Sequence, residues 1–198
     1  MPSRSKANEE APSIVSVTNL TTVARDGFGL NIVIENPGSE TLFVVSTCLD
    51  GRIERRVAGA TSFHQAVTYN ITLNAHVQTQ EHTTLEADVS EPDEEDWIVP
   101  CKGEFTHEFS TNNGHRLWEY RLCLDTPAEI PASSRIKLRL LFRRGKRSVA
   151  KEVSKGAFIA ATVLGERVND HGLTIKCEGK KTLRAPVNSD FLSFIANW

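Results

Sequence analysis

Hydrophobic and polar side chains alternate along several stretches of this 198-residue chain. In the clearest stretch Val67, Tyr69, Ile71 and Leu73 share one face, and residues 118–125 and 135–142 repeat the pattern. A side-chain period of two is typical of a strand with one buried and one wet face. Without long helical stretches between them, such strands predict antiparallel hairpins. We therefore expect an all-β fold, an antiparallel two-sheet sandwich of jelly-roll or immunoglobulin-like type with about ten to twelve short strands.

Turn-forming residues separate the expected strands. Pro presets φ and Gly tolerates positive φ, so both are frequent in turns. The turn signals are residues 36–39, residues 112–114, Pro127 with Pro131, residues 144–146 and residues 169–172. Residues 149–161 also permit a short helix, although Gly156 and β-branched residues disfavour it.

The chain ends are expected to differ from the central domain. Residues 1–12 are polar and charged, which predicts a flexible N-terminal arm, and residues 13–187 form a single β-sandwich with an acidic loop near 86–96. Residues 188–198 predict a short helix that begins at Asn188 or Ser189. Its apolar side chains, which we expect to dock on the sandwich or on a partner, are Phe191, Leu192, Phe194, Ile195 and Trp198.

Bulk charge and apolar patterning restrict the setting of the protein. The net charge of −2 predicts no global attraction to nucleic acid or to an anionic membrane. No apolar run follows the basic residues near the N-terminus, and none approaches the roughly 20 residues that span a bilayer. We therefore predict a cytoplasmic protein without membrane contact. In that setting Cys48, Cys101, Cys123 and Cys177 are expected to be reduced thiols, with two disulfides as the alternative in an exported protein.

Catalytic and metal-binding patterns are missing from the sequence. The six histidines are scattered and match no compact zinc spacing. Cys101, His107 and Glu108 can be drawn as a thiol, base and orienting acid, but any three such residues would qualify. The acidic run lacks the ligand spacing of a helix-loop-helix calcium site, so we interpret it as a solvated loop, with a non-standard calcium loop as the alternative. We predict no catalytic residue, no metal and no cofactor.

The strongest local anomaly is a basic stripe. Nine of the 23 basic residues fall between positions 135 and 155, against one acid, Glu152. Such a stripe can bind an acidic partner or neutralise phosphates. It can equally be a charged sheet edge that prevents aggregation, or pair with the acidic loop within or between molecules. The predicted binding residues of the stripe are Arg135, Lys137, Arg139, Arg143, Arg144, Lys146 and Arg147.

These observations favour a non-enzymatic binding or assembly protein that makes protein–protein contacts through charged surfaces and termini. A partner protein or self-association is expected, and a coat or shell subunit of a virion is one specific version. One alternative is a nucleic-acid-binding protein that uses the stripe between Arg135 and Arg147. Another is a jelly-roll enzyme acting on a carbohydrate or small molecule, with Trp118 or Tyr120 as platform and acids from Glu104 to Glu119. That reading requires Trp118 and Tyr120 to be exposed.

Overall fold

The computed structural model describes residues 11–20, 27–59, 61–82, 97–112, 114–156 and 161–197. Within these ranges the side chains of residues 80–82, 97, 161 and 166–170 are not described. The acidic run 86–96, most of the predicted N-terminal arm and Trp198 lie outside the described residues.

The described residues are almost entirely β-strand, with a short C-terminal helix. The elements are β1 (Ser13–Asn19), β2 (Gly27–Asn36), β3 (Leu42–Gly59), β4 (Phe63–His82), β5 (Trp97–Ser110), β6 (His115–Ile130), β7 (Ser134–Gly156), β8 (Ala161–Cys177), the single-turn 3-10 helix η1 (Glu178–Lys180), β9 (Thr182–Pro186) and α1 (Asp190–Ala196). This confirms the predicted antiparallel all-β class with a C-terminal helix. No helix in the described part of the chain is long and apolar enough to cross a membrane.

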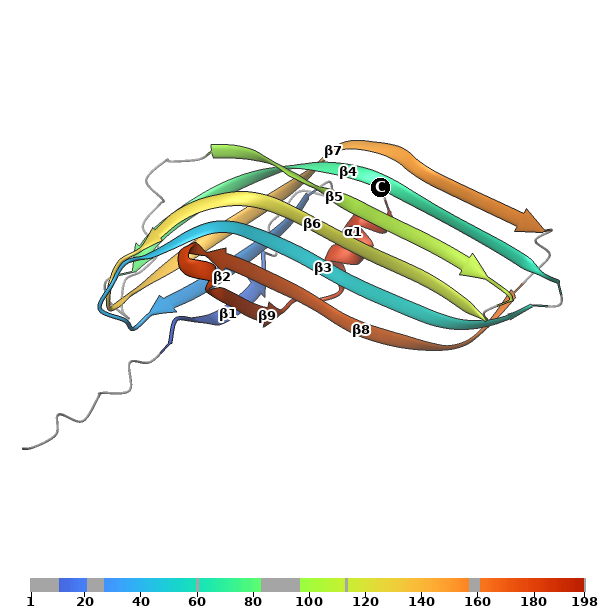
Figure 1. Ribbon diagram of the computed structural model, residues 1–198, viewed down its shortest axis with the longest axis horizontal. Helices are drawn as coiled ribbons and strands as arrows, with labels where there is room; N and C mark the ends of the chain where they lie inside the picture. The colour runs from blue at the N-terminus through green and yellow to red at the C-terminus, as the bar shows by residue number, and fades with distance from the viewer. Residues whose placement is uncertain are drawn as a thin grey trace, which may run out of the picture.

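The strands form one sheet and not two. Their order is β1-β2-β7-β4-β5-β6-β3-β8-β9, and every paired neighbour is antiparallel (Figure 1). The two edge strands, β1 and β9, approach each other, so the sheet is nearly closed around its core. The described strands therefore form a single nearly closed sheet, in place of the predicted two-sheet sandwich of ten to twelve short strands. Side-chain alternation reports one buried face per strand, and a single sheet that curls on itself satisfies that requirement as well as two stacked sheets.

Several expected breaks lie inside long strands. Residues 144–146 and 149–156 belong to the 23-residue strand β7, so the turn and the helix predicted there are wrong. Residues 169–172 lie in β8, and Pro127 lies in β6. At three of these places the register shifts: opposite Asp50–Arg52 in β3, between Thr72 and Leu73, and between Thr68 and Tyr69. Extra residues at these positions mark β-bulges, and where the extra residue is a glycine, as at Gly145, the bulge resembles a turn signal in the sequence.

The core fills the closed part of the sheet. Its most deeply buried side chains include Leu30 and Ile32 from β2, Leu138 and Leu140 from β7, and Leu73 from β4. Helix α1 packs on the same inner face. The ring centroid of Phe191 lies 5.1 Å from that of Phe28, 5.3 Å from Tyr120 and 5.3 Å from Phe142. Phe191, Leu192 and Ile195 are buried in the molecule itself and Phe194 is partly buried, so the predicted helix docks on its own sheet.

Six strands continue past the core as a distal half. β2 pairs with β7 only as far as Arg143, and β9 pairs with β8 only from Gly172 to Lys176. Beyond these points the sheet order is β7-β4-β5-β6-β3-β8, so β7 and β8 become its edges (Figure 1). One side of this half is continuous with the core-facing side of the sheet, and we call it the inner face. The opposite side is the outer face.

Cysteine behaviour differs from the prediction of four reduced thiols. Cys48 in β3 and Cys123 in β6 are direct register partners, with Cα atoms 4.1 Å apart, and they form a disulfide. Cys101 and Cys177 are buried free thiols that belong to the core. The disulfide was missed because its residues are 75 positions apart, and only the strand register brings them together.

Candidate functional site: an arginine–aromatic cluster

A row of rings lines the inner face of the distal half. Tyr69 in β4 pairs with Phe105 in β5, and their ring centroids lie 6.2 Å apart. His107, two residues along β5, pairs with Trp118 in β6. These two rings are stacked, with centroids 5.3 Å apart and an interplanar angle of 13°. Paired residues in antiparallel strands point to the same face, so the register alone assembles this row.

Three guanidinium groups lie over the rings. Cζ of Arg147 is 3.8 Å from the ring centroid of Tyr69. Cζ of Arg116 and Cζ of Arg55 are 4.6 Å and 5.1 Å from the centroid of Trp118. All three separations are within the range at which a cation is attracted to the face of an aromatic ring. We call Arg55, Arg116, Arg147 and the four rings the arginine–aromatic cluster.

The position of Arg147 depends on a bulge in β7. Thr72 of β4 pairs with Lys146, whereas Leu73 pairs with Arg144, so Gly145 is the extra residue. A side chain at this glycine would overlap the carbonyl oxygen of Thr72. The extra residue shifts the alternation by one position. As a result, Arg144 and Arg147 share the inner face with Leu73 and Ile71, while Arg143 and Lys146 stay on the outer face.

His107 is held in its neutral form by its neighbours. Nε of Arg116 donates a 3.0 Å hydrogen bond to Nε2 of His107, so this nitrogen must be unprotonated. Burial lowers the pKa of His107 below its ordinary value, and the charges of Arg116 and Arg147 lower it further. The ring therefore serves as an acceptor that orients Arg116.

Positive charge is crowded in the cluster. The pKa of Arg116 is also lowered, first by burial and then by the charge of Arg55. The arginine stays protonated, and its partial burial leaves the cation less well solvated than it would be in water. The terminal Nη atoms of Arg116 make no hydrogen bond or ion pair with any residue that the structure describes.

Apolar side chains are exposed along both edges that flank the cluster. Val149 on β7 is 57% exposed, and Val163 and Leu164 on β8 are 54% and 60% exposed. Val149 is the register partner of Tyr69, so it borders the ring row directly. Exposed apolar side chains beside a charged surface are common at interaction sites.

The residues of the predicted basic stripe lie on two faces. Arg135, Lys137 and Arg139 project from the outer face, as predicted for one side of a strand. There Arg135 pairs with Glu35 at 3.1 Å, and Arg139 donates hydrogen bonds to Asn31 and Gln78. Arg144 instead turns inward and donates a 3.0 Å hydrogen bond to the carbonyl oxygen of Asn197 after α1. The stripe is therefore not one continuous surface.

The residues considered for catalysis are separated by the sheet. Tyr120 is 2% exposed and Trp118 is half-buried under two arginines. Glu108 pairs with Leu117 and therefore lies on the outer face, opposite His107 and Trp118. There its Oε1 lies 3.0 Å from Nε2 of His115 and 3.7 Å from Nδ1 of His64. Burial raises the pKa of the Cys101 thiol to about 12, which disfavours a reactive thiolate.

Metal binding finds no support in the described residues, where no group of three or more His, Cys, Asp or Glu side chains is arranged to hold an ion.

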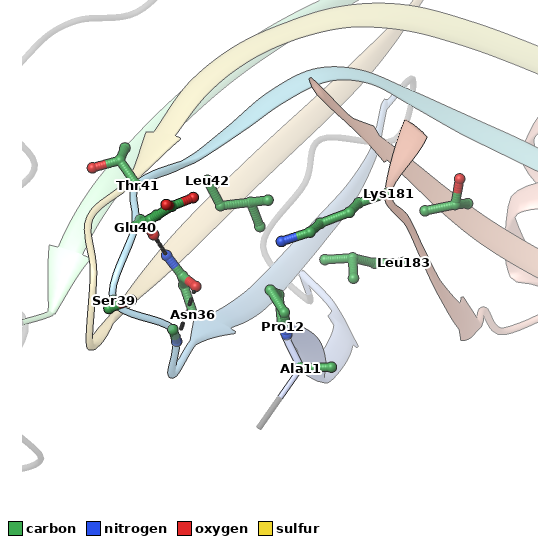
Figure 2. Close-up of a pocket in the computed structure, with 11 residues that line it drawn as sticks. Ala11, Pro12, Asn36, Ser39, Glu40, Thr41, Leu42, Lys181 and Leu183 are labelled. Carbon is green, nitrogen blue, oxygen red and sulfur yellow. Dashed lines mark hydrogen bonds between the residues drawn. The ribbon is translucent and has the colours of Figure 1, made fainter. Parts of the chain in front are cut away.

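A hollow lies at the closed end of the sheet, between the starts of β1 and β9 (Figure 2). It has a volume of about 510 Å³ and is open to solvent. Asn36 shapes its wall, because Nδ2 donates hydrogen bonds to the carbonyl oxygens of Glu40 and Ile130 at 2.8 and 3.0 Å. Glu40 and Lys181 supply opposite charges. The lining mixes polar and apolar side chains and contains no cluster of like-charged groups.

The chain was compared with protein-family models, with curated proteins and with solved structures, and none of the three comparisons found a match.

Sequence reasoning missed the cluster. From the sequence, Trp118 is expected only as the platform of an enzyme, and Arg55, Arg116 and Tyr69 are not singled out as functional. Arg116 and Trp118 are two residues apart in β6, so they share a face, and Arg55 joins them because it pairs with Arg116. That register, with Arg55 opposite Arg116, is the missing signal.

Proposed function

We propose that this chain is a non-enzymatic binding and assembly protein, and that the arginine–aromatic cluster is the surface that binds an anionic partner. The observation that carries this proposal is the position of two guanidinium groups, those of Arg55 and Arg116, within 5.1 and 4.6 Å of the centroid of one ring, Trp118, with Arg116 held by His107 through its Nε. The folded chain keeps like charges close together in a partly desolvated place. An anion bound there would relieve that repulsion.

The geometry of the cluster suits planar anions. A guanidinium stacked on a ring keeps its N–H groups at its edge, where they can donate to two oxygens of one carboxylate or phosphate. Arg116 is fixed by Trp118 on one side and by His107 through its Nε, which leaves its Nη atoms as the donors. Such fixed donors lose little side-chain entropy when they bind a ligand.

Binding to labelled poly-L-glutamate tests this proposal. Arg116→Gln and Arg147→Gln should each weaken binding by about tenfold, the effect of losing one charge-assisted contact. Arg143→Gln and Arg56→Gln are the matched controls, because they remove the same charge from the outer face of β7 and β3. Equal losses in all four variants would reduce the interaction to net charge and overturn the proposal, as would an affinity that does not fall with added salt.

A further inference from the structure

The cluster has a counterpart in the same chain. Seven acids lie between positions 86 and 96, in a segment that joins β4 to β5 and lies outside the described residues. In its first part the apolar residues Leu85, Ala87 and Val89 alternate in sequence with the acids Glu86 and Asp88. The distal inner face offers arginines beside exposed valines.

Chain length prevents the segment from reaching Arg116 of its own molecule. Trp97 pairs with Val77, and Phe105 lies eight residues further along β5, which is about 26 Å at roughly 3.3 Å per residue. Phe109, the partner of Arg116, lies twelve residues from Trp97, or about 40 Å.

The segment must also return to His82, five residues beyond Val77 in the other direction. Fifteen links of about 3.5 Å span about 52 Å, and about 17 Å of this is needed to connect His82 with the level of Trp97. About 17 Å of outward reach remains, because the chain has to go out and come back. This falls short even of Phe105. It falls far short of Phe109, so only another molecule can bring these acids to Arg116.

We infer that the arginine–aromatic cluster of one molecule binds the acidic segment 85–96 of a second copy of this chain. This inference rests on the proposed function of the cluster and names its partner. The two surfaces lie at different places on the molecule, so the contact is head-to-tail and can continue from copy to copy or close into a ring. Because the contact is largely electrostatic, assembly should weaken with added salt.

The decisive experiment mixes two complementary variants and measures mass by light scattering. One variant carries Arg116→Gln and Arg147→Gln and keeps its acidic segment. The other carries the seven acids of the segment as amides and keeps its cluster. Each variant alone should be a monomer. The mixture should form a one-to-one dimer, because the acidic segment of the first variant can still bind the cluster of the second. The unmodified chain should form larger species. A mixture that stays monomeric, or assembly of either variant alone, overturns the inference.

A peptide of residues 84–97 separates failure of the partner from failure of the site. The peptide should bind the variant whose seven segment acids are amides more tightly than poly-L-glutamate does. Adding Arg116→Gln to that variant should remove the binding. If poly-L-glutamate or a single-stranded oligonucleotide binds the cluster but the peptide does not, the inference fails while the proposed function stands. If none of the three binds, both fail. If Lys137→Gln with Arg139→Gln abolishes peptide binding and Arg116→Gln does not, the segment binds the outer stripe and the inference is overturned.

Discussion

Nε of Arg116 donates a hydrogen bond of 3.0 Å to Nε2 of His107, and this bond exists only while His107 is neutral. Among the described side chains, those that share the inner face with His107 are mainly cationic or uncharged: Arg55 on β3, Tyr69 on β4, Arg116 on β6 and Arg147 on β7, with the acid Glu152 also on β7. Protonation would break the bond and add a further positive charge to the cluster. Acid should therefore weaken this part of the fold.

The direction of this pH effect follows from the number of protons that the folded and unfolded chains bind. The pKa of His107 in the folded chain lies below its ordinary value of 6.5, so below pH 6.5 the unfolded chain binds more protons and unfolding is favoured. The loss of stability begins as the pH falls through 6.5 and stops growing below the folded pKa. His107→Gln keeps an acceptor for Arg116 but cannot titrate. Urea unfolding across this range should show a smaller acid loss in the variant, by about 1.4 kcal/mol per unit of pKa difference. If the variant and the unmodified protein lose the same unfolding free energy as the pH falls, His107 is not the group responsible.

Gly51 should be intolerant of any side chain. A Cβ at this position would overlap the His171 ring and lie 2.7 Å from Cε1 of Tyr120. Tyr120 and His171 are both buried and share a 3.1 Å hydrogen bond, so neither ring can move away without losing it. Gly51→Ala should lower the free energy of unfolding by about 1–3 kcal/mol, the usual cost of overpacking. Gly165→Ala is the control, because no atom lies within 4 Å of its added Cβ, and it should be nearly neutral in the same urea titration.

The features that the sequence predicted correctly depend on single strands. The faces of Val67–Leu73 and of Trp118–Leu124 follow from alternation alone, because one strand presents its side chains at a fixed period. The docked helix follows from the apolar residues near Phe191. These are local properties, and the sequence therefore contains them.

The features it did not predict depend on which residues lie opposite one another. The bond between Arg116 and His107 requires the register of β5 against β6, and the single curled sheet requires the full strand order. Gly145 was interpreted as a turn, although its bulge keeps β7 continuous and directs Arg147 inward. A bulge and a turn both use glycine, so residue type alone does not separate them.

Thiol counting should give two free cysteines in the unfolded, unreduced chain. Cys48 and Cys123 are bonded, and Cys101 and Cys177 are buried with raised thiol pKa values. Alkylation in denaturant should label two thiols before reduction and four after it, whereas the native protein at mildly alkaline pH should label slowly. Mass spectrometry of the labelled peptides identifies the pair. Four labelled thiols without reductant would contradict the disulfide.

The Cys48–Cys123 bond should also contribute to stability. It closes a loop of 75 residues, so it restricts the unfolded chain strongly. Replacing both cysteines with Ser should lower the free energy of unfolding by about 2–4 kcal/mol. Adding reductant to the unmodified protein should cause a loss of similar size, and the double variant should be insensitive to reductant. A double variant as stable as the oxidised protein would show that the bond adds nothing.

Arg144 should stabilise the docked C-terminal helix. Its Nη2 donates to the carbonyl oxygens of Asn197 at 3.0 Å and of Phe194 at 3.5 Å, and its Cζ lies 5.7 Å from the Phe194 ring centroid. These carbonyls end α1, where a helix carries partial negative charge, so a cation there is favourable. Arg144→Gln should lower the free energy of unfolding by about 1–2 kcal/mol and speed proteolysis of the C-terminal segment.

Arg143→Gln is the matched control for this prediction. It removes the same charge one residue away, but Arg143 is exposed on the outer face, whereas Arg144 turns inward to α1. Its effect on unfolding should stay within about 0.5 kcal/mol, as for most surface substitutions. If both variants lose the same stability, the contribution of Arg144 is one of overall charge and not of capping. If only Arg144→Gln is affected, the bulge at Gly145 has a structural role besides its role in the cluster, because it also directs Arg144 inward to the end of the helix.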